Sequence, residues 1–298
     1  MIQNTTSDFF LDARFVRRAF DTASAGFDKH AVVHGEIRTR LLERLDVVRI
    51  EPTSVLDLGA GTGLATRELK RRYRNAQVTA LDLSPGMLGQ AGKQSSFFHR
   101  FARVAGDVQR LPFADASFDL VFSNLMLQWV GNPDAAITEA RRVLKPEGLF
   151  TFTSLGPDSL RELRQAWSAA DAREHVHAFI DMHDLGDALM RAGFAEPVMD
   201  TERLTVTYND WPTLRSELQG TGSANLAYGR SRGLTGKAAV NRAQAAFAAL
   251  RANNVFPVSL EVVYGHAWAG ALRKRRSTGG EVNIPLANLT GRRPTIVK

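Results

Sequence analysis

The sequence contains no cysteine, which excludes disulfide bonds, thiolate metal ligands and a cysteine nucleophile. It also lacks any uninterrupted apolar run of the roughly 18 residues that a membrane-spanning helix needs. Residues 1–20 carry no charged leader followed by an apolar block, so we expect no secretory signal. The remaining composition, 44% hydrophobic and 23% charged, is that of a globular protein. Together these features predict a cytoplasmic protein with no membrane partner.

Acidic residues are in the minority, with 31 Asp and Glu against 38 Lys and Arg, which gives a net charge of +7 over 298 residues. Such a surplus favours acidic partners. The segment 273–298 accounts for most of it, because it holds seven basic residues and the single acid Glu281. It lacks sustained hydrophobic periodicity, so we expect a disordered basic tail. The rest of the chain is nearly neutral, and nucleic acid is not the expected partner.

Short apolar runs alternate with helix-like segments in the first half of the chain. The runs include SVLDL, QVTALDL, FDLVFSN and GLFTFTSL, several of them rich in β-branched residues. Alternation of this kind is typical of βαβ units in a doubly wound, largely parallel sheet. The sequence therefore predicts an α/β fold.

The pattern along the chain divides it into five expected parts. Residues 1–50 form a helical leader that acts as a lid, and residues 51–208 form the nucleotide-binding core. A helical cap at 209–257 is inserted before a final core strand at 258–270. The basic tail then occupies 271–298.

The stretch SVLDLGAGTG (54–63) reads as a strand and a glycine turn, followed by the helix-like LATRELKRRY. A tight structural turn is one interpretation of the glycines. The other is a ligand site, because glycine lets a ligand approach the main chain and the start of a helix offers free N–H groups. Asp82 closes the next strand about 20 residues further on, where a carboxylate accepts both ribose hydroxyls in nucleotide sites. Ser84, followed by Pro85, is the better helix cap, so we favour the ribose role for Asp82.

DLGAGTG differs from the GxGxxG of dinucleotide sites and resembles the first motif of class I S-adenosylmethionine-dependent methyltransferases. LDLSPGML resembles the second motif of that superfamily. GDVQRLPFADASFDLVFSN and EARRVLKPEGLFTFTS resemble its motifs at the third to fifth strands. The resemblance covers residues 51–155. It implies a Rossmann-like sheet, mostly parallel with the last strand antiparallel, helices on both faces, and S-adenosyl-L-methionine as the cofactor.

The resemblance also implies a role for individual residues. The glycine turn would wrap the methionine part of the cofactor, Asp82 would hold the ribose, and Asp107 would accept from the adenine amino group. Leu83 and Met87 would flank the adenine, with Val108 nearby, although Leu83 and Met87 also suit core positions. The cofactor residues that we predict are Phe27, Asp57, Gly59, Gly61, Gly63, Asp82, Leu83, Met87, Asp107, Val108 and Asn124.

The segment after the fourth strand narrows the choice of methyl acceptor. It reads SNLMLQWV and not the Asn/Asp-Pro-Pro-aromatic motif of base amino-methyltransferases. We find no clustered carboxylates of the kind that metal-dependent catechol chemistry requires, so no metal is expected. A small molecule or a carrier-bound acyl group remains.

The outer segments resemble the malonyl-[acyl-carrier protein] O-methyltransferase family. RRAFDTASAGFDKHAVVHGEI matches its leader, and HAFIDMHDLGDALMRAGF, LRSELQGTGSANL and EVVYGHAW match later segments, so the resemblance covers about 14–268. It implies methylation of the free carboxylate of a malonyl thioester, on acyl-carrier protein or coenzyme A, at the start of biotin synthesis. Phe27 stands where the family often has tyrosine, which puts any role of a phenolic hydroxyl in doubt.

The absence of an evident general base agrees with a carboxylate acceptor. A carboxyl group has a pKa near 4, so it is already a nucleophile at neutral pH. Transfer then needs in-line placement and exclusion of water.

Recognition of that carboxylate requires hydrogen-bond donors. A cap arginine, Arg215 or Arg230, offers bidentate geometry, although surface charges are commonly only solvated. Gln128 and Trp129 are placed to line the acceptor channel, and the leader histidines His30 and His34 are further candidates.

Three other functions remain open. One is a quinone C- or O-methyltransferase. The second is a methyltransferase-like protein that acts on a protein side chain, and the third is a non-catalytic protein whose basic tail binds nucleic acid.

Overall fold

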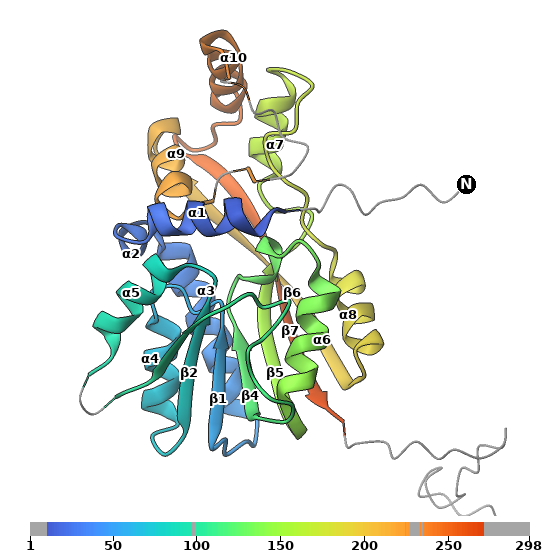
Figure 1. Ribbon diagram of the computed structural model, residues 1–298. Coiled ribbons are helices and arrows are strands. Elements are labelled where there is room, and N and C mark those ends of the chain that lie inside the picture. Colours follow the sequence, from blue (N-terminus) through green and yellow to red (C-terminus); the bar gives the residue numbers. More distant parts are fainter. Residues whose placement is uncertain (1–10, 97–98, 224, 227–232, 234, 271–298) are drawn as a thin grey trace, which may run out of the picture.

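The computed structural model describes residues 11–96, 99–223, 225–226, 233 and 235–270. Within them, seven strands form one sheet in the order β3-β2-β1-β4-β5-β7-β6 (Figure 1). The strands are β1 (Ser54–Leu58), β2 (Gln77–Asp82), β3 (Ala102–Ala105), β4 (Phe118–Ser123), β5 (Leu144–Leu155), β6 (Phe194–Tyr208) and β7 (Phe256–Ala269). Strands β1 to β5 pair in parallel, whereas β7 is antiparallel to both β5 and β6. The predicted sheet, with its last strand antiparallel, is confirmed.

Helices cover both faces of the sheet. On one face, α3 (Val32–Arg44), α4 (Leu64–Arg72) and α5 (Pro85–Gln94) pack on β1, β2 and β4 through a buried, mostly aliphatic cluster. On the other face, α6 (Pro133–Val143) and α8 (Met182–Arg191) pack on a cluster that includes Phe150 and Phe152. Both faces of the central strands are therefore buried, as their continuous apolar runs require.

The leader folds into α1 (Ala13–Ala23), α2 (Phe27–His30) and α3. Asp12 caps α1 by accepting a hydrogen bond from the Arg14 N–H. Gly26 lies between α1 and α2 and is the N-cap residue of α2. Helices α1 and α2 lie across the carboxyl ends of the parallel strands (Figure 1).

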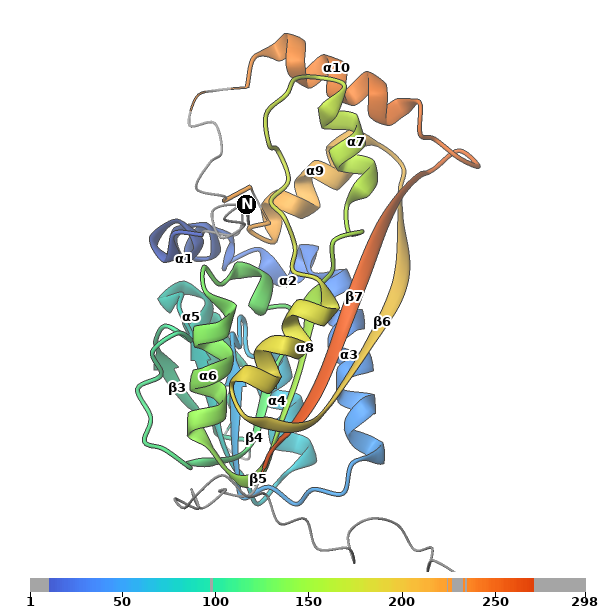
Figure 2. The same cartoon turned by 90° about the vertical axis from the view of Figure 1, so that its right-hand side faces the viewer.

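Strands β6 and β7 form a long antiparallel hairpin whose far end extends beyond the other strands of the sheet and carries the cap (Figure 2). Between them lie α9 (Trp211–Gly220) and α10 (Lys237–Ala248). A third cap helix, α7 (Arg161–Ser168), comes from the segment before β6, and the three helices share an apolar cluster with the far end of the hairpin. The cap is thus assembled from two separate stretches of sequence. Among the described helices, none has the length and apolar content needed to cross a bilayer.

Candidate functional site

The turn after β1 has the backbone geometry that its glycines allow. Gly59, Gly61 and Gly63 have φ values of +71°, +54° and +79°, in the region that favours glycine. The N–H groups of Gly59 and Ala60 both donate to the Leu81 carbonyl, at 2.9 and 3.0 Å. A Cβ atom at Gly61 would meet no atom within 4 Å, so this part of the turn faces open space. The turn is therefore fixed on its strand side and bare on its outer side.

Asp82 lies at the carboxyl end of β2, directly beside this turn. Its Oδ2 accepts from the Gly61 N–H and its Oδ1 from the Ser84 N–H, both at 2.8 Å. Burial raises the pKa of the Asp82 carboxyl to about 6. Ser84 caps α5, with Pro85 in the first turn, as the sequence predicted.

A cavity of about 110 Å³ opens where the carboxyl ends of β1, β2 and β4 meet helix α1. Most of the predicted cofactor residues line it, namely Phe27, Gly59, Gly61, Asp82, Leu83, Met87, Asp107, Val108 and Asn124. Two do not: Asp57 is buried beneath the glycine turn, and Gly63 packs against α5. Residues from four strand ends and the leader thus converge on one small cavity.

Two carboxylates hold the leader over this cavity. Asp21 of α1 accepts from the Ser84 hydroxyl at 2.6 Å and from the Gly86 N–H at 2.9 Å. Asp28 of α2 accepts from the Thr62 hydroxyl of the glycine turn at 2.6 Å. The leader helices are therefore attached directly to the two segments that surround the ribose candidate Asp82.

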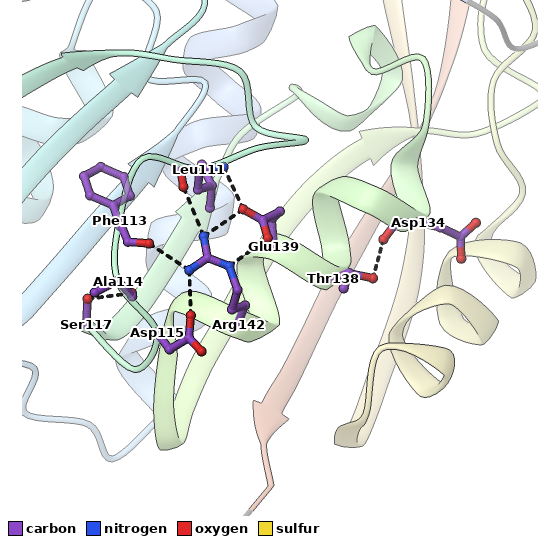
Figure 3. Close-up of polar contacts among 9 residues, drawn as sticks. All are labelled: Leu111, Phe113, Ala114, Asp115, Ser117, Asp134, Thr138, Glu139 and Arg142. Carbon is purple, nitrogen blue, oxygen red and sulfur yellow. Dashed lines mark hydrogen bonds and ion pairs between the residues drawn. The ribbon is translucent and has the colours of Figure 1, made fainter.

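The loop after β3 is held by Arg142 of α6 (Figure 3). Its guanidinium donates to the carbonyl oxygens of Leu111 and Phe113, at 3.0 and 2.7 Å. It also pairs with the carboxylates of Asp115 and Glu139, at 2.8 and 2.7 Å. Glu139 in turn accepts from the Leu111 N–H at 2.7 Å, and the Arg142 hydrogen bonds lower the pKa of Glu139. The fork of guanidinium donors fixes the loop that continues from Asp107.

Asp57 forms a buried hydrogen bond at the base of the turn, with the Thr66 hydroxyl donating to Oδ2 at 2.5 Å. Burial, assisted by the neighbouring Asp82 charge, raises the pKa of Asp57 to about 7. Between the ordinary carboxyl pKa and pH 7, the unfolded chain releases this proton before the folded protein does. Asp57 therefore lowers the free energy of unfolding as the pH rises through that window.

We predict that Asp57→Asn removes this pH dependence. The variant should gain stability relative to the unchanged protein as the pH rises. Its free energy of unfolding minus that of the unchanged protein should be about 2 kcal/mol larger at pH 7.5 than at pH 5. Urea denaturation at the two pH values measures the difference. A difference that is the same at both pH values would contradict a raised pKa of Asp57.

A second and larger cavity, of about 450 Å³, lies between the core and the cap. Its wall is mostly apolar and aromatic, with Trp167, Tyr208 and Trp211 contributed by the cap side. His34, Leu125 and Trp129 line both cavities. The two cavities therefore share one wall, at the carboxyl end of β4.

Some, but not all, of the residues predicted to bind the methyl acceptor line this larger cavity. Gln128 and Trp129, on the short 3-10 helix η2 (Leu127–Trp129), line it, as does Arg215 of α9. Arg215 is exposed, and Arg230 lies outside the described residues. Of the two leader histidines, His34 lines both cavities, whereas His30 lies against Gly220 of the cap.

His177 is a cavity residue that the sequence analysis missed. It is 6% exposed, and its ring packs on Trp129 with centroids 5.0 Å apart. Burial lowers the pKa of His177 to about 4. The only sequence signal was its place in HAFIDMHDLGD, because the segment between α7 and α8 has no regular periodicity. Three or more metal-binding side chains do not cluster anywhere among the described residues.

Comparisons with known proteins identify related chains. Residues 56–152 match the family model of a methyltransferase domain. The malonyl-[acyl-carrier protein] O-methyltransferase of Laribacter hongkongensis is 47% identical over 91% of this chain and 94% of its own length. The enzyme of the same name from Gallionella capsiferriformans is 44% identical over 91% and 95%.

The fold also has solved relatives. Phosphoethanolamine N-methyltransferase 2 of Haemonchus contortus, solved in complex with S-adenosyl-L-methionine, matches with a TM-score of 0.52 at 18% identity. The match covers 84% of this chain and 57% of that one. At this identity the likeness shows the fold.

Proposed function

This chain belongs to the malonyl-[acyl-carrier protein] O-methyltransferase family, and we propose that it methylates the free carboxylate of a malonyl thioester carried by an acyl-carrier protein. The methyl donor in this proposal is S-adenosyl-L-methionine. The observation that carries the proposal is the shared wall, because a methyl donor in the smaller cavity and an acceptor in the larger one would lie next to each other.

The residues of the smaller cavity suit this cofactor. The open side of Gly61 leaves room for a ligand against the main chain, and Asp82 is a buried carboxylate at the strand end beside it. Leu83 and Met87 offer apolar contacts to an adenine, and Asp107 offers an acceptor. When bound, the cofactor supplies an electrophilic methyl group on a sulfonium centre. Asn124 and the glycine turn would hold its amino-acid end.

The smaller cavity is tighter than a cofactor of this size requires. Its volume of about 110 Å³ is below the roughly 300 Å³ at which ligand pockets begin. We therefore propose that the leader helices move aside when the cofactor enters, which would break the contacts made by Asp21 and Asp28. Their reclosure would exclude water from the reacting groups.

Transfer needs no proton movement by the protein. With the cofactor bound, a carboxylate oxygen of the acceptor would attack the methyl carbon, and the electron pair of the broken carbon–sulfur bond would stay on the sulfur. The protein must bring the two partners into line and keep water out. The mostly apolar wall of the larger cavity and the closed leader suit both tasks.

We predict that the purified chain, incubated with S-adenosylmethionine and malonyl-carrier protein, adds one methyl group to the carrier, as measured by intact mass spectrometry. Acetyl-carrier protein is the matched control, because it lacks the terminal carboxylate and should gain no mass. If the malonyl carrier gains no mass while the chain binds the cofactor, the proposed function is wrong.

A further inference from the structure

The larger cavity is lined, on and beside the wall that it shares with the smaller one, by buried polar atoms that have no hydrogen-bond partner. Five buried side-chain atoms of this kind occur in the part of the chain that the structure describes. Three of them, His34 Nδ1, Gln128 Oε1 and His177 Nε2, belong to residues that line the larger cavity. Because buried polar groups are nearly always paired, three such atoms around one cavity indicate a missing polar ligand.

Neighbouring aromatic rings contact the two imidazoles without satisfying these atoms. The His177 ring lies between Trp129 and Phe179, with centroid distances of 5.0 and 4.8 Å. The backbone carbonyl of His34 accepts from the Asn124 side chain at 3.2 Å, and its ring packs on Phe27 at 5.3 Å. Gln128 and His177 are 7% and 6% exposed. The Gln128 and His177 side chains are therefore buried and the His34 side chain is partly buried, while their polar atoms stay available.

The two imidazoles are neutral at physiological pH. Burial lowers the pKa of both His34 and His177 to about 4. Each neutral ring carries one N–H donor, and rotation of the Gln128 amide by half a turn presents its NH₂ group to the same space. Neutral donors bind a carboxylate without transferring a proton to it, so its oxygen remains a nucleophile.

The cap side of the cavity suits a carboxylate less well. Glu217 of α9 lines it, and a second negative charge there would be repelled. The exposed Arg215 lies on the same helix, only two positions from this acid. The shared wall has no carboxylate from the cap, and it adjoins the cofactor cavity, where the methyl group must arrive.

We propose that His34, Gln128 and His177 bind the reacting carboxylate of the acceptor through neutral hydrogen bonds. The inference rests on the proposed function and deepens it, because it names the residues that select an acid as the acceptor. The cap and its aromatic residues then face the rest of the acyl carrier arm.

The test compares the binding of two carrier proteins by calorimetry, with S-adenosylhomocysteine present so that no turnover occurs. One carrier bears malonate and the other bears its terminal amide, which is equal in size but uncharged. The unchanged protein should bind the malonyl form more tightly. His177→Phe and Gln128→Leu should each weaken the binding of the malonyl carrier about 10- to 100-fold. The affinities for the amide carrier and for S-adenosylhomocysteine should stay nearly unchanged. The preference for the malonyl carrier over the amide carrier should therefore be lost.

Two variants serve as controls. His175→Phe changes a histidine of the same cavity whose ring stacks on Trp167 at 3.9 Å and whose Nε2 is bonded to Asp171 at 2.8 Å, and it should keep the discrimination. His177→Gln places an amide near the position of Nε2 and should restore much of it. It also tests the site if the Phe variant does not fold.

The outcomes separate the inference from the function on which it rests. Discrimination that persists in both His177→Phe and Gln128→Leu, or equal weakening of both carriers, overturns the inference alone. An unchanged protein that does not distinguish malonate from its amide also overturns the inference, whereas a failure of the proposed function is seen separately, as the absence of methyl transfer to malonyl-carrier protein.

Discussion

Replacing Asp82 with alanine should lower the affinity for S-adenosylmethionine by at least about 100-fold, because two hydrogen bonds to a buried carboxylate are lost together. The Asp82 oxygens now accept from the N–H groups of Gly61 and Ser84, and they line the smaller cavity. A bound ribose would place both of its hydroxyls on this carboxylate. Calorimetric titration with the cofactor measures the loss, and far-UV circular dichroism shows whether the variant is folded.

The same carboxylate predicts a pH dependence of binding. The pKa of Asp82 is about 6 in the free protein, and only the ionised form accepts from both hydroxyls. The affinity should therefore fall below pH 6, approaching tenfold per pH unit, and this dependence should disappear in Asp82→Ala. Asp119→Asn is the matched control, because Asp119 pairs with Lys145 at the opposite end of the sheet. An affinity unchanged by Asp82→Ala would exclude the ribose role.

The second large effect concerns Gly63, whose substitution by alanine should lower the free energy of unfolding by about 3 kcal/mol or more. Its φ of +79° is costly for any residue with a Cβ atom. An added Cβ would also lie 2.7 Å from Ala91 Cβ and 2.9 Å from Ala91 Cα in helix α5. The backbone of α5 would have to move away from α4, so much of the protein should fail to fold. Urea denaturation and the soluble yield measure the effect.

Gly89→Ala provides the control for this substitution. Gly89 lies in α5, an added Cβ there meets no atom within 4 Å, and its φ is not positive. Alanine at this helical position should raise the free energy of unfolding by about 0.5–1 kcal/mol. If Gly63→Ala is no less stable than Gly89→Ala, the packing of the glycine turn against α5 is not as described.

The cofactor half of the site could be predicted because its signals are local. A strand, a turn with alternate glycines and a helix follow one another within residues 54–72, and parallel pairing of β1 with β2 then brings Asp82 to the turn. The buried position of Asp57 was harder to predict from the sequence, because its contact with Thr66 depends on how α4 packs over β1. The roles of these residues toward the cofactor remain predictions.

The acceptor half could be predicted only in part. Gln128 and Trp129 follow β4 directly, so their place at the sheet edge could be inferred from the sequence. His177 comes from an irregular segment that reaches the cavity only because α7 joins α9 and α10 in the cap, and that packing joins residues far apart in sequence. The helical cap expected at 209–257 likewise contains two separate helices, α9 and α10, whose bounds the sequence did not indicate.

The shared wall has a consequence for how such proteins diversify. The methyltransferase-domain match ends at residue 152, and most of the larger cavity's lining comes from residues 155–260. If the smaller cavity binds the methyl donor and the larger one the acceptor, as we propose, most of the residues that bind the two ligands lie on different stretches of the chain. Substitutions in the later stretch would then change the acceptor without disturbing the methyl donor, provided that the residues of the shared wall still suit both ligands. In a redesign of the acceptor cavity, the residues of this wall are those that would have to be compatible with both the new acceptor and the methyl donor.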